Sequence, residues 1–287
     1  MLPGIRFSAI RWSPPTGAES NGQRLAILHG VTGNAMSWGG VGTALARQGW
    51  TVDALDLPGH GQTRWTDGDG RPIRDQESVG ADRYELRHVG ELVAQALRAL
   101  PSPAPRAGTT PAPGAPAILG HSWGAGVAIM AIDSDAPVTR LILLDPPFMT
   151  PGQGADMAES FASELQPGMD LDAARALVRE WGEGEESVEA SAHAIVETSP
   201  LAAEAIARGG PWDPVAVMAA WRARHPDLPV DVIAGDSSVG GLIPPTILQL
   251  LRMALGPSRV HEMRGMGHSP HREDQQRFLA VLGGILG

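Results

Sequence analysis

The stretch Ala117-Ile118-Leu119-Gly120-His121-Ser122-Trp123-Gly124-Ala125-Gly126 is the part of the chain from which the fold is best inferred. An apolar, strand-like run ends at Gly120, and a helix-like run begins within a few residues of Ser122. Residues 120–124 therefore match G-x-S-x-G at a strand-to-helix turn, the context of a nucleophile elbow. Glycine flanks the serine because a side chain in so tight a turn would collide with the adjacent strand and helix. The N-terminus of the helix offers free N–H groups to an oxyanion beside Ser122.

Three further motifs accompany the elbow: LHGVTG at residues 28–33, DLPGHG at 56–61 and GMGH at 265–268. With these motifs in this order, the chain resembles the α/β-hydrolase-fold serine hydrolases over nearly its whole length. The resemblance implies an α/β fold with a mostly parallel central sheet flanked by helices. It also implies a helical cap inserted after the strand that ends at Asp145, and chemistry that needs no cofactor.

Composition excludes several classes of protein. The chain has 287 residues, a net charge of −10 and no cysteine. The negative charge argues against nucleic-acid binding, and the absence of cysteine excludes disulfides and a cysteine nucleophile. No signal peptide and no apolar run long enough to span a membrane are visible, so we expect a cytoplasmic protein. The nine histidines are scattered and no phosphate-binding loop is present, so we expect neither a metal nor a cofactor.

The chain alternates strand-like and helix-like segments, which is typical of a parallel sheet. We expect strands at residues 5–12, 25–28, 51–55, 117–120, 141–144, 230–234 and 260–263, helices at 37–48, 82–100 and 273–286, and a loop at 63–80. Between residues 148 and 224 this alternation stops, and helix-like segments occur at 171–181, 200–208 and 214–224. We therefore expect a hydrolase core at 1–147, a helical cap at 148–224 and the rest of the core at 225–287.

Ser122 needs a base to accept its proton, and His268 is the leading candidate. His268 follows the last predicted strand and comes last in the chain, which matches the order serine, acid, histidine of this fold. His271, three residues later, is a weaker candidate that we expect to be solvated.

The oxyanion hole requires two converging N–H donors. The family pattern predicts them on Trp123, directly after the nucleophile, and on Val31, in the loop beyond residues 25–28. His29 and His60 are expected to brace their loops through hydrogen bonds and to take no part in the chemistry.

Two aspartates compete for the place of the acid that orients His268. The family usually places the acid in a G-x-x-D turn after the strand at residues 230–234, but Ser238 stands at that position here. Asp236 lies two positions earlier and is the preferred candidate. Asp145, directly after the strand at 141–144, is the alternative, because some members of the fold draw their acid from that place.

The predicted substrate pocket contains tryptophans of the cap and two residues near family pocket positions. We expect substrate contacts from Trp181, Trp212, Trp221, Trp38 and Met149, whose indole and thioether groups suit an apolar substrate. Glu183, Glu185 and Glu186 are expected on a solvated turn.

The expected reaction is hydrolysis of a small, mostly apolar carboxylic ester or lactone through an acyl-enzyme on Ser122. Carbon–carbon bond hydrolysis, cofactor-free perhydrolysis and a lyase reaction use the same elbow and remain alternatives. A ligand-binding protein without catalytic activity is a further alternative, which an intact serine and histidine argue against. A serine at the nucleophile position disfavours the dehalogenase and epoxide-hydrolase chemistries, which use aspartate.

Overall fold

The computed structural model describes residues 4–74, 76–101, 114–148, 156–157, 159–160, 165, 168–208 and 221–287. Its centre is a seven-stranded sheet in the order β2-β4-β3-β6-β7-β8-β9. The strands are β2 (Ala9–Trp12), β3 (Arg24–Leu28), β4 (Thr51–Leu55), β6 (Ala117–His121), β7 (Arg140–Leu144), β8 (Val230–Gly235) and β9 (Val260–Met263). Only β2 runs antiparallel to its neighbour; the other pairs are parallel. The predicted α/β fold with a mostly parallel sheet is confirmed.

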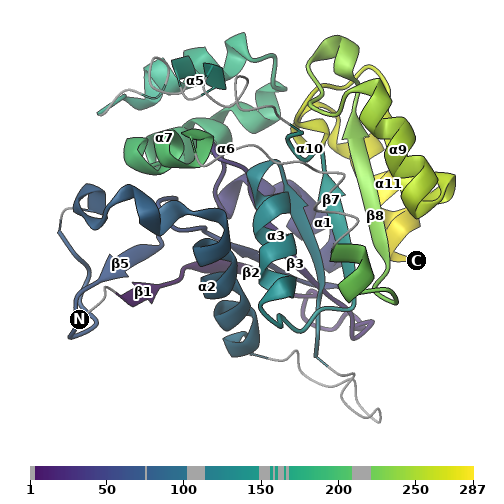
Figure 1. The fold of residues 1–287 in the computed structure, drawn as a ribbon, viewed down its shortest axis with the longest axis horizontal. Helices are drawn as coiled ribbons and strands as arrows, with labels where there is room; N and C mark the ends of the chain where they lie inside the picture. Colours follow the sequence, from purple (N-terminus) through teal and green to yellow (C-terminus); the bar gives the residue numbers. More distant parts are fainter. Residues whose placement is uncertain are drawn as a thin grey trace.

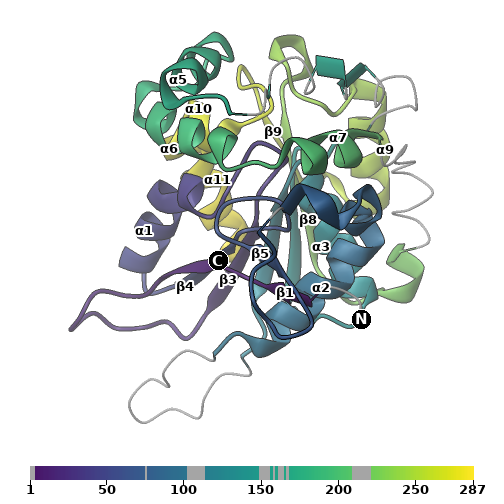
Figure 2. The same cartoon turned by 90° about the vertical axis from the view of Figure 1, so that its left-hand side faces the viewer.

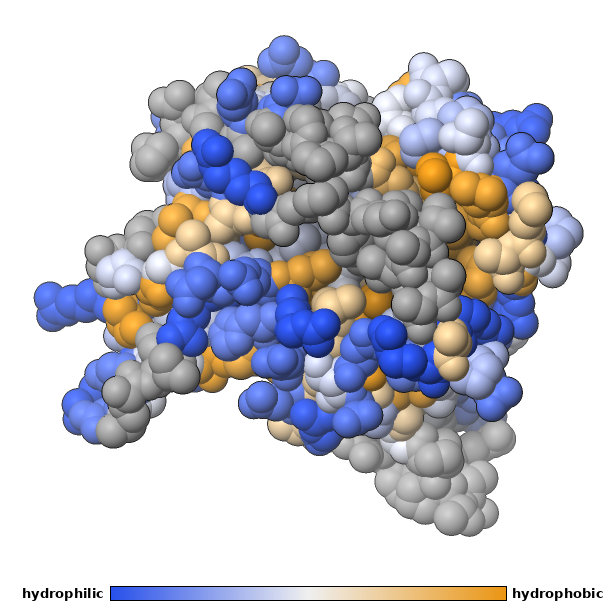
Figure 3. Space-filling view, viewed as in Figure 1, coloured by the Kyte–Doolittle hydropathy of each residue, from blue (hydrophilic) through white to orange (hydrophobic). Residues whose placement is uncertain are grey.

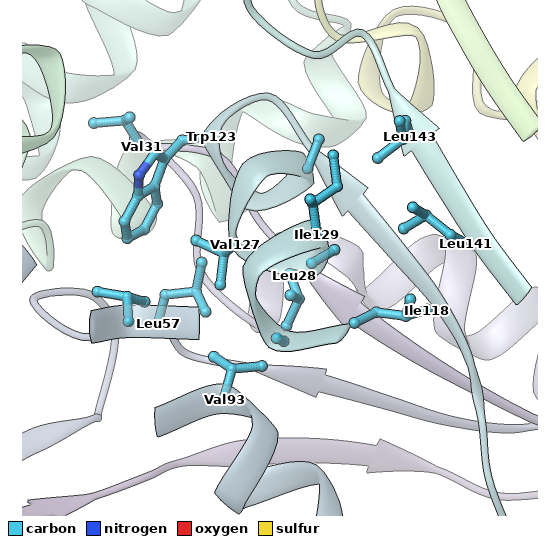
Figure 4. Close-up of a cluster of buried hydrophobic side chains, with 14 of the residues drawn as sticks. Leu28, Val31, Leu57, Val93, Ile118, Trp123, Val127, Ile129, Leu141 and Leu143 are labelled. Carbon is cyan, nitrogen blue, oxygen red and sulfur yellow. The ribbon is translucent and has the colours of Figure 1, made fainter. Parts of the chain in front are cut away.

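Helices cover both faces of the sheet, because alternate residues of each strand point to opposite faces. Leu25 and Ile27 of β3 pack with α1 (Gly39–Arg47) and α11 (Gln275–Leu286). Ala26 and Leu28 face α2 (Leu86–Ala99), α3 (Trp123–Asp133) and α9 (Pro245–Leu255). Figure 4 shows this second cluster. Burial on both faces explains why the central strands are nearly continuous apolar runs.

The N-terminal region differs from the prediction. Residues 5–12 form two strands in different sheets, because β1 (Gly4–Arg6) pairs antiparallel with β5 (Arg64–Thr66) outside the main sheet. The predicted loop at 63–80 therefore contains a strand, and also the 3-10 helix η2 (Gln76–Val79). Pairing of this kind leaves no clear sequence signal, because β1 and β5 have only three residues each.

The part of the chain that the structure describes between β7 and β8 includes the helices α5 (Leu171–Glu180), α6 (Glu185–Val196) and α7 (Pro200–Arg208). Asp170 caps α5 by accepting a hydrogen bond from the Ala173 N–H at 2.9 Å. Figures 1 and 2 show these helices above the carboxyl ends of the parallel strands. The predicted helix at 214–224 lies outside the described residues except for 221–224, which are helical.

The described helices include none that has the length and apolar character needed to cross a bilayer. Apolar surface gathers at the upper right of Figure 3, on the side of α9, where Leu250 and Met253 are exposed. Neither side chain lines the cavity described below.

Candidate active site

Ser122 lies at the turn between β6 and α3 in a strained backbone conformation, with φ 54° and ψ −126°. Its N–H donates a hydrogen bond to the Leu144 carbonyl at 2.9 Å. A Cβ at Gly120 would lie 2.3 Å from the Gly124 carbonyl oxygen, and a Cβ at Gly124 would lie 2.4 Å from the His29 carbonyl oxygen. Both positions therefore require glycine, and the turn has the geometry of a nucleophile elbow.

His268, after β9, and Asp145, after β7, form a hydrogen-bonded pair. His268 Nδ1 lies 2.7 Å from Asp145 Oδ2. Because a carboxylate only accepts hydrogen bonds, Nδ1 carries the proton and Nε2 is left free to act as a base. Among the described residues this is the only side-chain hydrogen bond of the His268 ring, so Nε2 and the Ser122 hydroxyl are not hydrogen-bonded in this structure.

The Asp145 carboxylate is completely buried and holds a fixed orientation. Besides His268, it accepts hydrogen bonds from the backbone N–H groups of Gly235 and Leu242, each at 2.9 Å. These three donors compensate for the loss of water around a buried charge. Asp145 itself adopts a positive φ of 39°.

The preference for Asp236 as the partner of His268 is wrong on this geometry. The Asp236 carboxylate instead accepts hydrogen bonds from the Ser238 hydroxyl at 2.6 Å and from the Gly265 N–H at 2.9 Å. These bonds hold the pKa of Asp236 down to about 2. Its side chain is committed to closing the turn after β8, where it caps the 3-10 helix at Ser237–Val239.

The expected oxyanion donors, Val31 and Trp123, both line the cavity that contains Ser122. Within the described residues no acceptor is bonded to either backbone N–H. Both groups are therefore free to donate to a ligand, as an oxyanion hole requires.

His29 and His60 brace the loops beside this hole. His60 Nε2 lies 2.6 Å from the Val31 carbonyl oxygen, and His29 Nε2 accepts the N–H of Leu57 at 2.9 Å. Burial lowers the pKa of both rings. Neither histidine lines the cavity, so the geometry fits the bracing role expected of them.

His121 and His271 form a buried layer beneath His268. The His121 ring lies 4.7 Å from the His268 ring and 4.6 Å from the His271 ring, measured between centroids. His271 stacks on Trp38 at 4.1 Å and is buried, so the expectation that it is solvated is wrong. Burial is the main reason that the pKa values of His121 and His271 lie well below the ordinary value.

A cavity of about 840 Å³ joins the elbow, the histidine and the α5–α7 region. Its walls include Ser122, His268, Met157, Trp181 and Ile206. Within the described residues, no group of histidine, aspartate and glutamate side chains is arranged to hold a metal ion.

The predicted pocket residues are only partly brought together. Trp181 lines the cavity, whereas Trp38 and Trp221 are fully buried and do not line it, so the structure does not bring them to the cavity as expected. Trp38 packs instead on His271, and Trp221 on His225. Met149 and Trp212 lie outside the described residues.

Sequence reasoning missed a buried ion pair on the cavity wall. Arg272 Nη1 lies 2.7 Å from Glu183 Oε1, and both side chains are about 5% exposed. Glu183 is therefore not on a solvated turn, although the neighbouring Glu185 is exposed. The sequence offers no signal for this pair, because its members are 89 residues apart.

A sequence model described as "Alpha/beta hydrolase family" matches residues 25–281 of the chain. The sequence has no significant match among curated proteins.

Solved structures share the fold at low sequence identity. E-2-(acetamidomethylene)succinate hydrolase superposes with a TM-score of 0.72 and 20% identity, covering 98% of this chain and 99% of its own. N-formylmaleamic acid deformylase from Pseudomonas putida superposes with a TM-score of 0.68 and 20% sequence identity, covering 99% of this chain and 98% of its own. An epoxide hydrolase from Bacillus megaterium superposes with a TM-score of 0.66 and 18% sequence identity, covering 99% of this chain and 97% of its own. Since these proteins bear the names of different reactions, their likeness to this chain concerns the fold alone.

Proposed function

The chain belongs to the alpha/beta hydrolase family, and we propose that it is a serine hydrolase that cleaves a carboxylic ester or lactone. The observation that supports this most is that the strained Ser122 and His268 line one cavity, while the buried Asp145 carboxylate is bonded to the His268 ring. This arrangement supplies a nucleophile, its base and the group that orients the base.

In the proposed reaction, His268 Nε2 takes the proton of the Ser122 hydroxyl while Oγ attacks the ester carbonyl carbon. The N–H groups of Val31 and Trp123 stabilise the negative oxygen that forms. The carbon–oxygen bond to the alcohol breaks, and the alcohol leaves with the proton from His268. A water molecule then gives a proton to His268 and attacks the acyl group, which releases the acid and restores Ser122.

Asp145 acts through His268 in this scheme. Its hydrogen bond fixes the tautomer with the proton on Nδ1, and its negative charge stabilises the imidazolium formed in each step. Two backbone N–H groups also bind the Asp145 carboxylate and hold it in place beside the ring.

We propose residues 148–224 as a cap domain, with 1–147 and 225–287 forming the core. Trp181 and Ile206, from the segment between β7 and β8, line the same cavity as Ser122. A mostly apolar cavity of this size favours a small, mainly apolar substrate.

The serine assignment can be tested with a fluorophosphonate probe, which should label the wild-type protein at one site. Ser122→Ala should abolish labelling and hydrolysis of short-chain aryl esters, whereas Ser134→Ala, at the other end of α3, should leave both intact. Peptide mapping identifies the modified residue. An adduct on a different serine, or full labelling of Ser122→Ala, would disprove the assignment.

The same assay separates this reaction from its closest alternatives. Product analysis on esters, lactones and vinylogous diketones shows which bond is cleaved. Diketone cleavage without ester turnover would favour carbon–carbon bond hydrolysis by the same residues.

A further inference from the structure

Arg272 is a buried cation on the wall of the catalytic cavity, four residues after His268. Only 4% of this residue is exposed. Among the described residues that line the cavity, it is the only arginine. It lies on the short helix α10 (Pro270–Glu273), which directly follows the loop of the proposed base.

The guanidinium of Arg272 has more donors than partners. Nη1 donates to Glu183, but Nε is buried without a hydrogen bond, and within the described residues Nη2 has no partner either. The other oxygen of Glu183 is occupied, because it accepts the hydroxyl of Ser191. Because Nε is buried, Nη2 is the donor that remains for a ligand, and a ligand group that accepts a hydrogen bond from it would bind favourably.

The charge around Arg272 determines which acceptor fits. Glu183 already neutralises the guanidinium, and the cavity wall also contains the carboxyl groups of Asp156 and Glu273. A carboxylate of the substrate would be repelled by this excess of negative charge. A neutral carbonyl or hydroxyl oxygen avoids that repulsion and still accepts a charge-assisted hydrogen bond.

We infer that Arg272, held by Glu183, forms a polar subsite that binds a neutral oxygen of the substrate other than the scissile ester group. The inference rests on the proposed ester hydrolysis at Ser122 and narrows its substrate class. The preferred substrates are esters or lactones with a second carbonyl or hydroxyl group, and plain alkyl or anionic esters are poorer ligands.

Three esters that differ in one end group test this subsite: ethyl 4-oxopentanoate, ethyl 4-methylpentanoate and monoethyl succinate. They present a ketone, an isopropyl group and a carboxylate in similar shapes, and a parallel series places the same groups on the alcohol side. Calorimetric titration of the Ser122→Ala protein measures binding without turnover. We expect the ketone ester to bind about tenfold or more tightly than the isopropyl ester in at least one series.

The variants separate the subsite from a structural role of the pair. Removing Arg272 alone would leave Glu183 buried without its cation, so Arg272→Met is combined with Glu183→Gln in the Ser122→Ala background. This variant should bring the ketone-to-isopropyl ratio close to one, while Arg264→Met should retain it. Arg264 is a suitable control because its side chain is 83% exposed and it does not line the cavity. If the double change prevents folding, Arg272→Lys is the alternative. Lysine keeps the positive charge but lacks the planar set of N–H donors of a guanidinium, so it should reduce the ketone-to-isopropyl affinity ratio.

Three results would overturn the inference: an unchanged ratio in the Arg272 variants, tightest binding of monoethyl succinate, or no measurable binding of the ketone esters. Failure of the proposed function has a different signature, because it would appear as wild-type protein that neither reacts with fluorophosphonate nor hydrolyses any ester.

Discussion

The two aspartates that compete for His268 differ in what surrounds their carboxyl groups. Both follow strands whose carboxyl ends meet at one edge of the sheet, so their positions in the sequence could not distinguish them. Asp145 is buried and bonded to the His268 ring, whereas the Asp236 carboxylate is used by Ser238 and Gly265. The difference depends on the turn after β8, whose backbone N–H groups at Gly235 and Leu242 point at Asp145.

We therefore predict that Asp145→Asn retains the fold but lowers kcat by a factor on the order of 10⁴, because the amide favours the wrong histidine tautomer. Asp236→Asn should lower kcat by less than about tenfold, since it alters only a surface turn. Steady-state kinetics on an aryl ester measures both values, with circular dichroism as the check on folding. Equal losses, or a larger loss for Asp236→Asn, would contradict the assignment of Asp145.

A second prediction at this scale concerns the buried histidines. Burial, and then the charges of His121, Arg272 and His268, keep the pKa of His271 well below its usual value. The folded protein thus binds fewer protons than the unfolded chain once the pH falls below about 6.5, and its stability decreases in that range. We expect the free energy of unfolding to fall between about pH 7.5 and about pH 5, with His271 contributing about 1–2 kcal/mol of the fall.

Urea unfolding of His271→Phe at both pH values measures this contribution, because phenylalanine does not titrate and keeps an aromatic ring on Trp38. The variant should lose less stability on acidification than the wild type. His193→Phe is the control, since His193 lies exposed on α6 and should leave the wild-type pH dependence unchanged. An identical pH dependence in His271→Phe would show that His271 is not the group responsible.

At the scale of the elements, the elbow was the most predictable part of the molecule. Its glycines, serine and flanking apolar runs are local in sequence, and each has one steric role. The succession of strands and helices along the chain, and the place of His268 after the last strand, could also be predicted, whereas the spatial order of the strands was not. Whether a large apolar side chain faces the cavity or the interior could not be predicted. Trp38 and Trp221 have the apolar character of pocket residues but pack inside the protein. Likewise, the Arg272–Glu183 pair depends on how the α5–α6 turn meets α10, which no local pattern encodes.

The steric argument for the elbow predicts opposite effects for two glycine substitutions. Gly124→Ala places a Cβ against the carbonyl oxygens of His29 and Leu28, neither of which can move freely. We expect it to reduce the free energy of unfolding by about 3 kcal/mol or more and to abolish labelling of Ser122. Gly283→Ala in α11 meets nothing within 4 Å and should be neutral or stabilising by up to about 1 kcal/mol. Urea unfolding tests both, and equal stability of Gly124→Ala and wild type would refute the steric account.

At the scale of the whole molecule, polar contacts attach the segment between β7 and β8 to loops that follow three different strands. Glu197, after α6, accepts hydrogen bonds from Asn34, beyond β3, and from Gln62, beyond β4, each at 2.9 Å. Glu183 pairs with Arg272, beyond β9. Because the loops after β3 and β9 also line the cavity, we expect substrate binding to affect α5–α7.

This arrangement predicts that occupation of the cavity stabilises the proposed cap. Trp181 and Ile206 line the same space as Ser122, so a bulky phosphonyl group on the serine should hold α5–α7 in the closed position. Hydrogen exchange followed by mass spectrometry should show slower exchange at residues 171–208 in the labelled protein than in the free protein. The strands β2 and β4, at the far edge of the sheet, should exchange as before. Ser122→Ala treated with the same probe controls for effects of the reagent, and should show no change in either region. If protection were confined to α3 and the His268 loop, the segment between β7 and β8 would not close over the substrate, and the proposed cap would have to be abandoned while the catalytic residues kept their roles.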